Sequence, residues 1–349
     1  MRPIGPMGLM RPIRRQFART LDYAMCVLMN RLQCRQRLDG RSRAALEAYL
    51  DECQSLTPAQ FFAAPPFDPR PASEPVTGLP ILRWDTPRPS GYPANDRAHV
   101  LLFMPHPGGP TVFLLHALAS IGDKGYRRLA RRFNAAGWNA CFIHLPYHYS
   151  RIPPGCLNGE FAVSADLVRT GEGLRQGVTE LRQLMAWLRG QGVREFGLWA
   201  TSYGGWIAAL LLGVEPDFRF AVLQAPIVNV AHAIWESGTS RHLRSELARC
   251  GITQSLVQRH EHLTSPMRVR PACGPDRVIL AAGLWDQISR PEDIAALHRL
   301  WAGSAFISVE QGHYGFRMGQ ACFQHLTTHG CIDGQDVSKI RNSKLEIRK

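Results

Sequence analysis

The chain has 349 residues, of which 45% are hydrophobic and 20% are charged. These values are ordinary for a globular protein and exclude a collagen-like, coiled-coil or wholly disordered chain. The formal net charge of +13 lies mostly at the ends: residues 1–43 hold ten arginines and two aspartates and carry +8, residues 336–349 carry +3, and the remainder carries +2. A nearly neutral body without interleaved basic and aromatic residues gives no indication of nucleic-acid binding.

Signals for membrane insertion and secretion are weak. The longest apolar run of the central region, Trp206 to Val214, is far shorter than the roughly 20 residues that a spanning helix requires. Arginines interrupt the N-terminal stretch, where a secretory signal needs an unbroken apolar segment. The nine cysteines are an odd set without a CxxC pair, as expected for reduced thiols without a metal role. We therefore expect a cytoplasmic protein.

Between residue 12 and about residue 53, two stretches have apolar residues at helical spacing. These are Leu21, Met25, Leu28 and Leu32, followed by Ala45, Leu46, Tyr49 and Leu50. Asp39-Gly40 separates them, and Thr57-Pro58 is typical of a helix start. We expect residues 1–63 to form a basic helical arm that packs on the main domain. An arginine-rich helix lying on an anionic membrane surface, or a weak contact with another protein, is the alternative.

Prolines dominate the next segment. Nine of them lie between Pro65 and Pro93, and proline lacks an amide donor and resists helix formation. We therefore expect residues 64–97 to be a linker or an extended segment that wraps around the main domain. At the other end of the chain, the basic residues 328–349 are expected to form a solvated tail.

From residue 98 to residue 327, apolar runs typical of strands alternate with segments of helical periodicity. Strands are predicted at Val100 to Met104, Val112 to Leu115, Ala140 to Leu145, Phe196 to Trp199, Phe220 to Gln224, Val278 to Ala282 and Ala305 to Glu310. Helices are predicted near residues 126–136, 171–189, 203–212, 291–301 and 316–326. This alternation predicts an α/β fold, with a doubly wound, mostly parallel sheet covered on both faces. Residues 228–275 are predicted to form a helical cap.

Three turns that follow predicted strands carry residue types used in nucleophilic catalysis. Ser202 stands where a strand runs directly into a helix, and the small residues Ala200 and Gly204 let the two elements approach each other. Asp286 and His313 follow two later strands. A serine hydroxyl becomes a nucleophile when a neutral imidazole accepts its proton and a carboxylate holds that imidazole in one tautomer. We therefore predict Ser202 as nucleophile, His313 as base and Asp286 as acid.

Two other acids are alternatives to Asp286, and neither is as well placed. Asp276 precedes its strand, and Glu292 lies inside the following helix. His260 and His262 lack the i, i+4 spacing of a zinc-binding helix. We expect both histidines at the surface, and we expect no metal and no cofactor.

The segment around Ser202 resembles the nucleophile elbow of the α/β-hydrolase superfamily, G-x-S-x-G, with Ala200 in place of the first glycine. The order serine, acid, histidine agrees with that superfamily, and the resemblance covers about residues 98–327. It implies an oxyanion hole made of two backbone N–H groups, those of Tyr203 and Leu118.

Two other turns carry the same resemblance. His116-Ala117-Leu118 is similar to a His-Gly-hydrophobic turn, with Ala117 replacing the glycine and His116 expected to support the turn. Leu145-Pro146-Tyr147-His148-Tyr149-Ser150 is similar to the turn Leu-Pro-Gly-His-Gly-x-Ser of many members. The elbow is also similar to that of prolyl-oligopeptidase-type peptidases, but the roughly 100 preceding residues are too few for the propeller that those enzymes carry.

The predicted function is hydrolysis of a carboxylic ester or thioester through an acyl-serine intermediate, and the expected partner is a small acyl substrate. Acyl transfer to an alcohol or amine is one alternative, and a peptidase or amidase using the same residues is another. A third is a scaffold protein whose catalytic residues are vestigial.

Overall fold

The computed structural model describes residues 6–67, 69–73, 78–118, 120 and 122–333, with the backbone alone over residues 6–10. The predicted tail lies outside the described residues from residue 334 on. Nine strands form one sheet in the order β1-β2-β3-β5-β4-β6-β7-β8-β9. Their bounds are β1 (Arg70–Ser73), β2 (Pro80–Asp85), β3 (Arg97–Phe103), β4 (Thr111–Leu115), β5 (Asn139–His144), β6 (Phe196–Thr201), β7 (Phe218–Gln224), β8 (Val278–Gly283) and β9 (Ala305–Val309).

The sheet has an antiparallel edge and a parallel body. Strands β1, β2 and β3 pair antiparallel, and β3 also pairs antiparallel with β5. From β5 onward, through β4, β6, β7, β8 and β9, all neighbours are parallel. The carboxyl ends of these parallel strands share one edge of the sheet, so the turns that follow β4, β6, β8 and β9 meet there.

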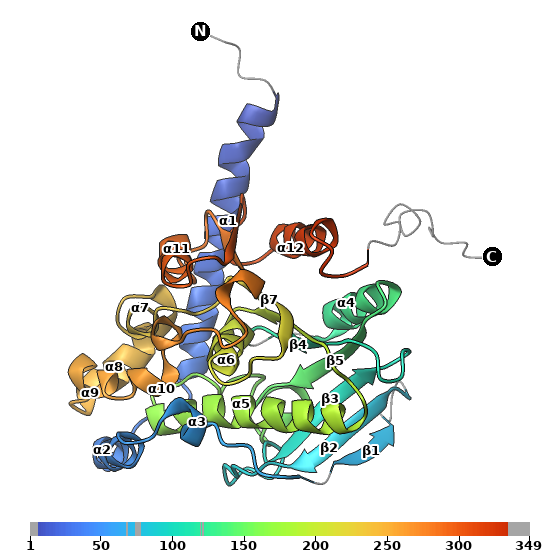
Figure 1. Cartoon of the computed structure of the whole chain (residues 1–349). Helices are drawn as coiled ribbons and strands as arrows, with labels where there is room; N and C mark the ends of the chain where they lie inside the picture. The colour runs from blue at the N-terminus through green and yellow to red at the C-terminus, as the bar shows by residue number, and fades with distance from the viewer. Residues whose placement is uncertain (1–5, 68, 74–77, 119, 121, 334–349) are drawn as a thin grey trace, which may run out of the picture.

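Helices pack on both faces of the sheet (Figure 1). One core includes side chains of α4 (Lys124–Ala135) and α12 (Arg317–Thr328), and the other includes side chains of α5 (Leu167–Gly190), α6 (Tyr203–Leu212) and α11 (Pro291–Leu300). Strand β4 alternates between them, with Val112 and Leu114 in the first core and Phe113 and Leu115 in the second. A strand buried on both faces is apolar throughout. The predicted doubly wound, mostly parallel α/β fold is confirmed.

The proline-rich segment differs from a free linker because it contains two strands of the sheet. Pro71 lies in the edge strand β1, and Pro80 is the first residue of β2. Both are positions where a strand tolerates a residue without an amide donor. Phe67 packs on Trp84 of β2 with ring centroids 5.0 Å apart. The segment therefore wraps around the sheet and extends it.

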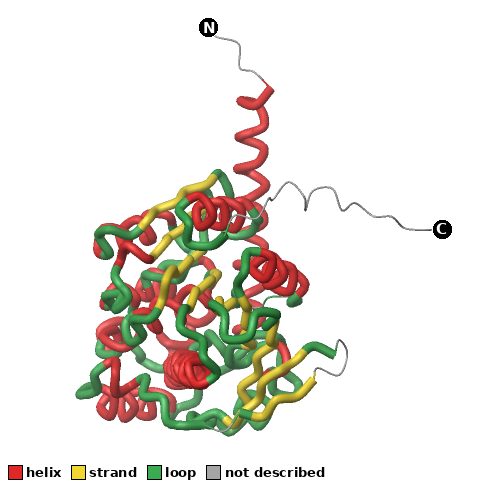
Figure 2. Tube along the Cα trace, turned by 45° about the vertical axis from the view of Figure 1, so that its right-hand side comes forward, coloured by secondary structure: helices red, strands yellow, loops and turns green. Residues whose placement is uncertain are grey.

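The N-terminal helix α1 (Pro6–Gln33) runs along the molecule, and its first turns project beyond it (Figures 1 and 2). Its buried residues are Ala18, Asp22, Cys26, Met29 and Gln33. This face is rotated from the predicted stripe, because Leu28 of that stripe is 44% exposed. Two polar residues, Asp22 and Gln33, therefore lie on the buried face, although the sequence periodicity predicted an apolar face.

The rest of the arm also contains helices. Helix α2 (Ser42–Cys53) buries Leu46, Tyr49 and Leu50, and α3 (Pro58–Phe61) begins with a capping box between Thr57 and Gln60. Across the described residues, no helix has the length and apolar character needed to cross a bilayer.

Residues 228–275, the predicted cap, contain several short helices. Its helices are α7 (Val230–Trp235), α8 (Arg241–Arg249), α9 (Gln254–Gln258) and α10 (Glu261–Thr264), with a short 3₁₀ turn, η2 (Gly238–Ser240). Asn30 of α1 donates to the Gly238 carbonyl at 2.7 Å and accepts from the His242 amide at 2.8 Å. The N-terminal arm is thus attached to the cap.

His260 is buried, so the prediction that it lies at the surface was wrong. Its ring lies 5.1 Å from that of Tyr49 and 5.5 Å from that of Phe61, centroid to centroid. Burial lowers its pKa to about 4, so the imidazole is neutral near pH 7. It belongs to the apolar contact between the arm and the cap.

Candidate active site

Ser202 lies in a sharp turn between β6 and α6. Its φ is +54° and its ψ is −113°, a strained combination for a non-glycine residue that is found at functional turns. The elements behind it are in close contact: a Cβ on Gly204 would lie 2.6 Å from the carbonyl oxygen of His116, and one on Gly205 would lie 2.8 Å from the Cβ of Pro226. The strand–turn–helix geometry expected of the elbow is present.

The structure brings Ser202, His313 and Asp286 together at the carboxyl edge of the sheet. Nε2 of His313 lies 2.9 Å from Oγ of Ser202, and Nδ1 of His313 lies 2.8 Å from Oδ2 of Asp286. The other oxygen of Asp286 accepts the N–H groups of Ile288 and Ser289, each at 2.8 Å. This arrangement allows the imidazole to accept the hydroxyl proton while the carboxylate holds the ring.

The two alternative acids lie elsewhere. Asp276 is exposed before β8, and Glu292 is exposed on the first turn of α11. Of the three carboxylates considered from sequence, Asp286 is the one that contacts the imidazole.

Opposing effects act on the protonation of His313. Burial lowers the pKa of the imidazole, but the negative charges of Asp286 and then Asp22 raise it, and the net result is a raised pKa. A raised pKa means that protonated His313 is stabilised by its surroundings. Above that pKa the ring is neutral and can act as a base; below it, it cannot.

Asp22 is a site residue that the sequence did not identify. It is fully buried on α1, and both of its carboxylate oxygens lie 3.1 Å from the backbone nitrogen of His313. Its Oδ2 also accepts the N–H of Gln287 at 3.0 Å. The available signal was that Asp22 is one of only two acids among the ten arginines of residues 1–43.

The predicted oxyanion donors border the same cavity as the nucleophile. Tyr203 is the first residue of α6, where N–H groups have no intrahelical partner, and Leu118 lies in the turn after β4. Both line the cavity that contains Ser202 and His313. The Gly204 amide donates to the His116 carbonyl at 3.1 Å and fixes the two turns against each other. Their role as oxyanion donors stays a prediction.

His116 supports its turn as the sequence suggested. Its Nε2 accepts the N–H of Leu145 at 3.1 Å, and its Nδ1 lies 2.9 Å from the Ala117 carbonyl. Burial lowers its pKa well below the usual range. A neutral ring can accept at one nitrogen and donate at the other, as these contacts require.

The turn after β5 replaces two expected glycines by tyrosines. Tyr147 and Tyr149 have φ values of +66° and +51°, the region that glycine adopts without strain. The Tyr147 amide donates to Oδ1 of Asn95 at 2.7 Å, and Arg151 forms a buried ion pair with Glu180 at 2.6 Å. These contacts hold the turn in a conformation that its own residues do not favour.

The cavity beside Ser202 has a volume of about 100 Å³. Helix α1 contributes Met29 and Gln33 to it, and the cap contributes Ile234 and Leu243. Apart from His313 its lining side chains are uncharged; they include Leu118, Val163, Ser164, Leu167, Thr170, Trp206, Ile227, Thr239, Ser240, Ile288 and Tyr314. The cavity suits a small group that is mostly apolar.

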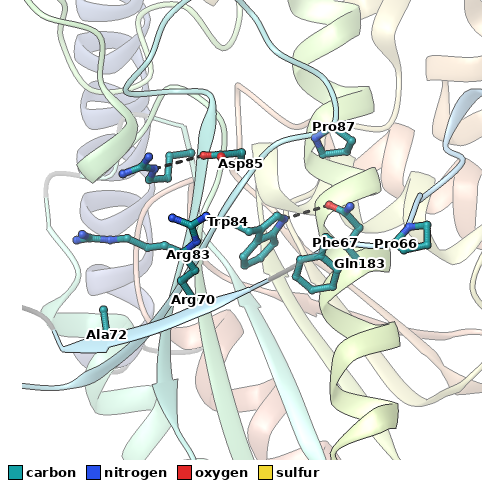
Figure 3. Close-up of a pocket in the computed structure, with 10 residues that line it drawn as sticks. Pro66, Phe67, Arg70, Ala72, Arg83, Trp84, Asp85, Pro87 and Gln183 are labelled. Carbon is teal, nitrogen blue, oxygen red and sulfur yellow. Dashed lines mark hydrogen bonds and ion pairs between the residues drawn. The ribbon is translucent and has the colours of Figure 1, made fainter.

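A larger hollow of about 350 Å³ lies at the antiparallel edge of the sheet and shares no lining residue with the Ser202 cavity (Figure 3). Two pairs of its polar side chains are in contact: Nε1 of Trp84 donates to Gln183 at 3.0 Å, and Arg97 pairs with Asp85 at 3.5 Å. Arg70 and Arg83 also line it. It is a feature of the sheet edge, separate from the candidate active site.

Buried cysteines of the core stay protonated near neutral pH. All nine are free thiols. Burial raises the pKa of Cys273 to about 11 and that of Cys322 to about 12, which keeps these thiols protonated. Within the described residues, no group of three or more His, Cys, Asp or Glu side chains could hold a metal ion.

Solved structures of acetyl xylan esterases share this fold. The acetyl xylan esterase from Paenibacillus sp. R4 has a TM-score of 0.58 at 14% sequence identity, over 81% of this chain and 94% of that one. Acetyl Xylan Esterase 1 from Thermoanaerobacterium sp. has a TM-score of 0.56 at 15% identity, over 80% and 92% of the two chains. With the strand order and the elbow, these likenesses show that the chain has the α/β-hydrolase fold.

Sequence comparisons find uncharacterized proteins from two strains of Mycobacterium tuberculosis. The chain is 24% identical to each of them over 318 residues, and the match covers 80% of this chain and 72% of each relative. No protein-family model matches the chain.

Proposed function

We propose that this protein is a serine hydrolase that cleaves a carboxylic ester or thioester through an acyl-serine intermediate. The observation that carries the proposal is the continuous pair of contacts from Ser202 Oγ to His313, at 2.9 Å, and from His313 to Asp286, at 2.8 Å. These contacts lie beside a cavity in which a substrate carbonyl can reach Oγ.

In the proposed reaction, His313 Nε2 takes the Ser202 hydroxyl proton as Oγ attacks the carbonyl carbon. The oxygen that becomes negative accepts the N–H groups of Tyr203 and Leu118. The tetrahedral intermediate expels the alcohol or thiol, which leaves with the proton from His313. Water then gives a proton to His313 and attacks the acyl-serine, and the carboxylic acid is released as the proton returns to Oγ. Asp286 holds the ring and stabilises its protonated form throughout.

An active-site-directed fluorophosphonate tests this proposal. The probe is expected to phosphonylate the native protein and to leave Ser202→Ala unlabelled, because only an activated serine displaces its fluoride. Ser255→Ala is the matched control, since Ser255 is an exposed serine of α9, and it should label like the native protein. Equal labelling of Ser202→Ala and native protein would refute the assignment, and an unlabelled native protein would favour a vestigial site.

The uncharged cavity predicts a neutral acyl group of short to medium length. Along a series of p-nitrophenyl esters, kcat/KM should rise roughly fourfold per added methylene, the equivalent of about 0.8 kcal/mol of burial, until the cavity is full. It should then level off or fall. The mono-p-nitrophenyl ester of succinic acid is the charged control and should react much more slowly than the pentanoate, because its carboxylate would be buried without a partner. Faster reaction of the charged ester would contradict this substrate class.

A further inference from the structure

We propose, on the basis of the proposed hydrolase function, that Asp22 of the N-terminal helix is a positioning residue that holds the turns bearing Asp286 and His313 in their reactive arrangement. Asp22 touches neither Ser202 nor the space beside it. It acts through two backbone N–H groups, one in each turn.

The need for an acceptor at this point follows from the backbone of the two turns. They are joined by two hydrogen bonds, from the Leu284 amide to the Val309 carbonyl at 2.9 Å and from the Trp285 amide to the Gln311 carbonyl at 3.0 Å. Beyond these, the amides of Gln287 and His313 both point to Asp22. Two donors cannot satisfy each other, and a carboxylate has an oxygen for each. Asp22 therefore continues the link between the turns where the backbone cannot.

Close packing fixes α1 against the turn that bears His313. A Cβ on Gly312 would lie 3.0 Å from both oxygens of Asp22 and 3.1 Å from the Cβ of Ala18. A Cβ on Gly283, at the end of β8, would lie 2.7 Å from the carbonyl oxygen of Gly312. Helix α1, the end of β8 and the turn after β9 therefore meet with no room for extra atoms. A shift of Asp22 would move the backbone next to the imidazole.

The charge of Asp22 acts on the imidazole as well. Asp286 contacts the ring from the turn after β8, and the charge of Asp22 acts on the ring from α1. The same charge acts on Cys26 and Tyr314. Burial raises the pKa of Asp22 itself, while the two amide donors favour its ionised form. The ionised carboxylate helps to raise the pKa of His313 and to stabilise the imidazolium that forms during the reaction.

The test compares Asp22→Asn with native protein and with Asn30→Ala. Asparagine keeps one acceptor oxygen, places an NH₂ donor against the other amide and removes the charge. Asn30→Ala is the matched control, because it also removes side-chain hydrogen bonds of α1, those to the cap and one to the Cys26 carbonyl within the helix, without touching the turns. For Asp22→Asn we expect kcat to fall about 10²-fold with KM little changed, as for a small misplacement of reacting groups. The acid limb of its kcat/KM profile should move to lower pH, because the pKa of His313 falls.

Direct titration of His313 by NMR, with isotope-labelled histidine, gives a readout that does not need turnover. The pKa of His313 should be lower in Asp22→Asn than in native protein and unchanged in Asn30→Ala. An unchanged pKa together with kcat no lower than in Asn30→Ala would overturn the positioning role. Failure of the proposed function is a separate result, namely a native protein that the fluorophosphonate does not label, or labelling that persists in Ser202→Ala. In that case the NMR titration alone decides whether Asp22 acts on His313.

Discussion

Turnover of a soluble ester is expected to fall by about 10⁴- to 10⁶-fold in Ser202→Ala, with the fold intact. The loss is large because removing Oγ removes the acyl-serine pathway, whereas the small side chain of Ser202 contributes little to packing. His313→Ala should lose about as much, since the hydroxyl then has no base within reach. Asp286→Asn should lose somewhat less, about 10⁴-fold, because the amide disturbs the tautomer and the charge of a ring that stays in place. Steady-state kinetics with circular dichroism as the folding check would measure this series.

Double variants test whether the three residues act as one unit. Ser202→Ala combined with His313→Ala should be no slower than either single variant, because the pathway is already lost with the first change. Losses that add in the double variant would argue against a shared mechanism. Full activity in Asp286→Asn would move the acid elsewhere, and Asp22 would be the first carboxylate to examine, since its charge also acts on His313.

The sheet and the Ser202 turn could be predicted from the sequence because their signals are local. Each central strand is buried on both faces and reads as a continuous apolar run, and helix α6 begins at Tyr203 and ends at Leu212 as predicted. The turn after Ser202 requires glycine, and Gly204 fits against the backbone of the neighbouring turn with no space for a side chain. The order of Ser202, Asp286 and His313 then follows from the order of the strands.

The remaining features depend on contacts between distant parts of the chain. Asp22 and His313 are 291 residues apart, and helical periodicity cannot show that a buried carboxylate will find two amide donors. For the same reason the predicted stripe on α1 was rotated from the buried face. Strands β1 and β2 were not predicted because they contain prolines. Proline is nevertheless accepted at an edge strand and at the start of a strand, where no amide donor is needed. Tyr147 and Tyr149 have positive φ values, which a glycine in the sequence would predict but a tyrosine does not.

Deletion of residues 1–40 is expected to reduce turnover more than Asp22→Asn does, that is, by more than about 10²-fold. The deletion removes Asp22 from the catalytic turns, and it removes Met29 and Gln33 from the wall of the Ser202 cavity. It also breaks the contacts of Asn30 with the cap, so the melting temperature should fall. Turnover of a short p-nitrophenyl ester and thermal unfolding measure the two effects.

Deletion of residues 1–13 alone is the matched control. It removes the first part of the projecting turns, including Ile13, which is 62% exposed, and keeps Ala18, Asp22 and the cavity residues. The deletion removes the exposed ion pair between Arg11 and Glu310. Such pairs contribute little to stability, so turnover and melting temperature should stay close to native. An arm that serves only as a membrane anchor predicts a different pattern. Deleting residues 1–40 would then leave turnover of soluble esters unchanged and would abolish a salt-sensitive binding to anionic vesicles. Because α1 places a buried carboxylate against the backbone of His313, we expect the loss of turnover.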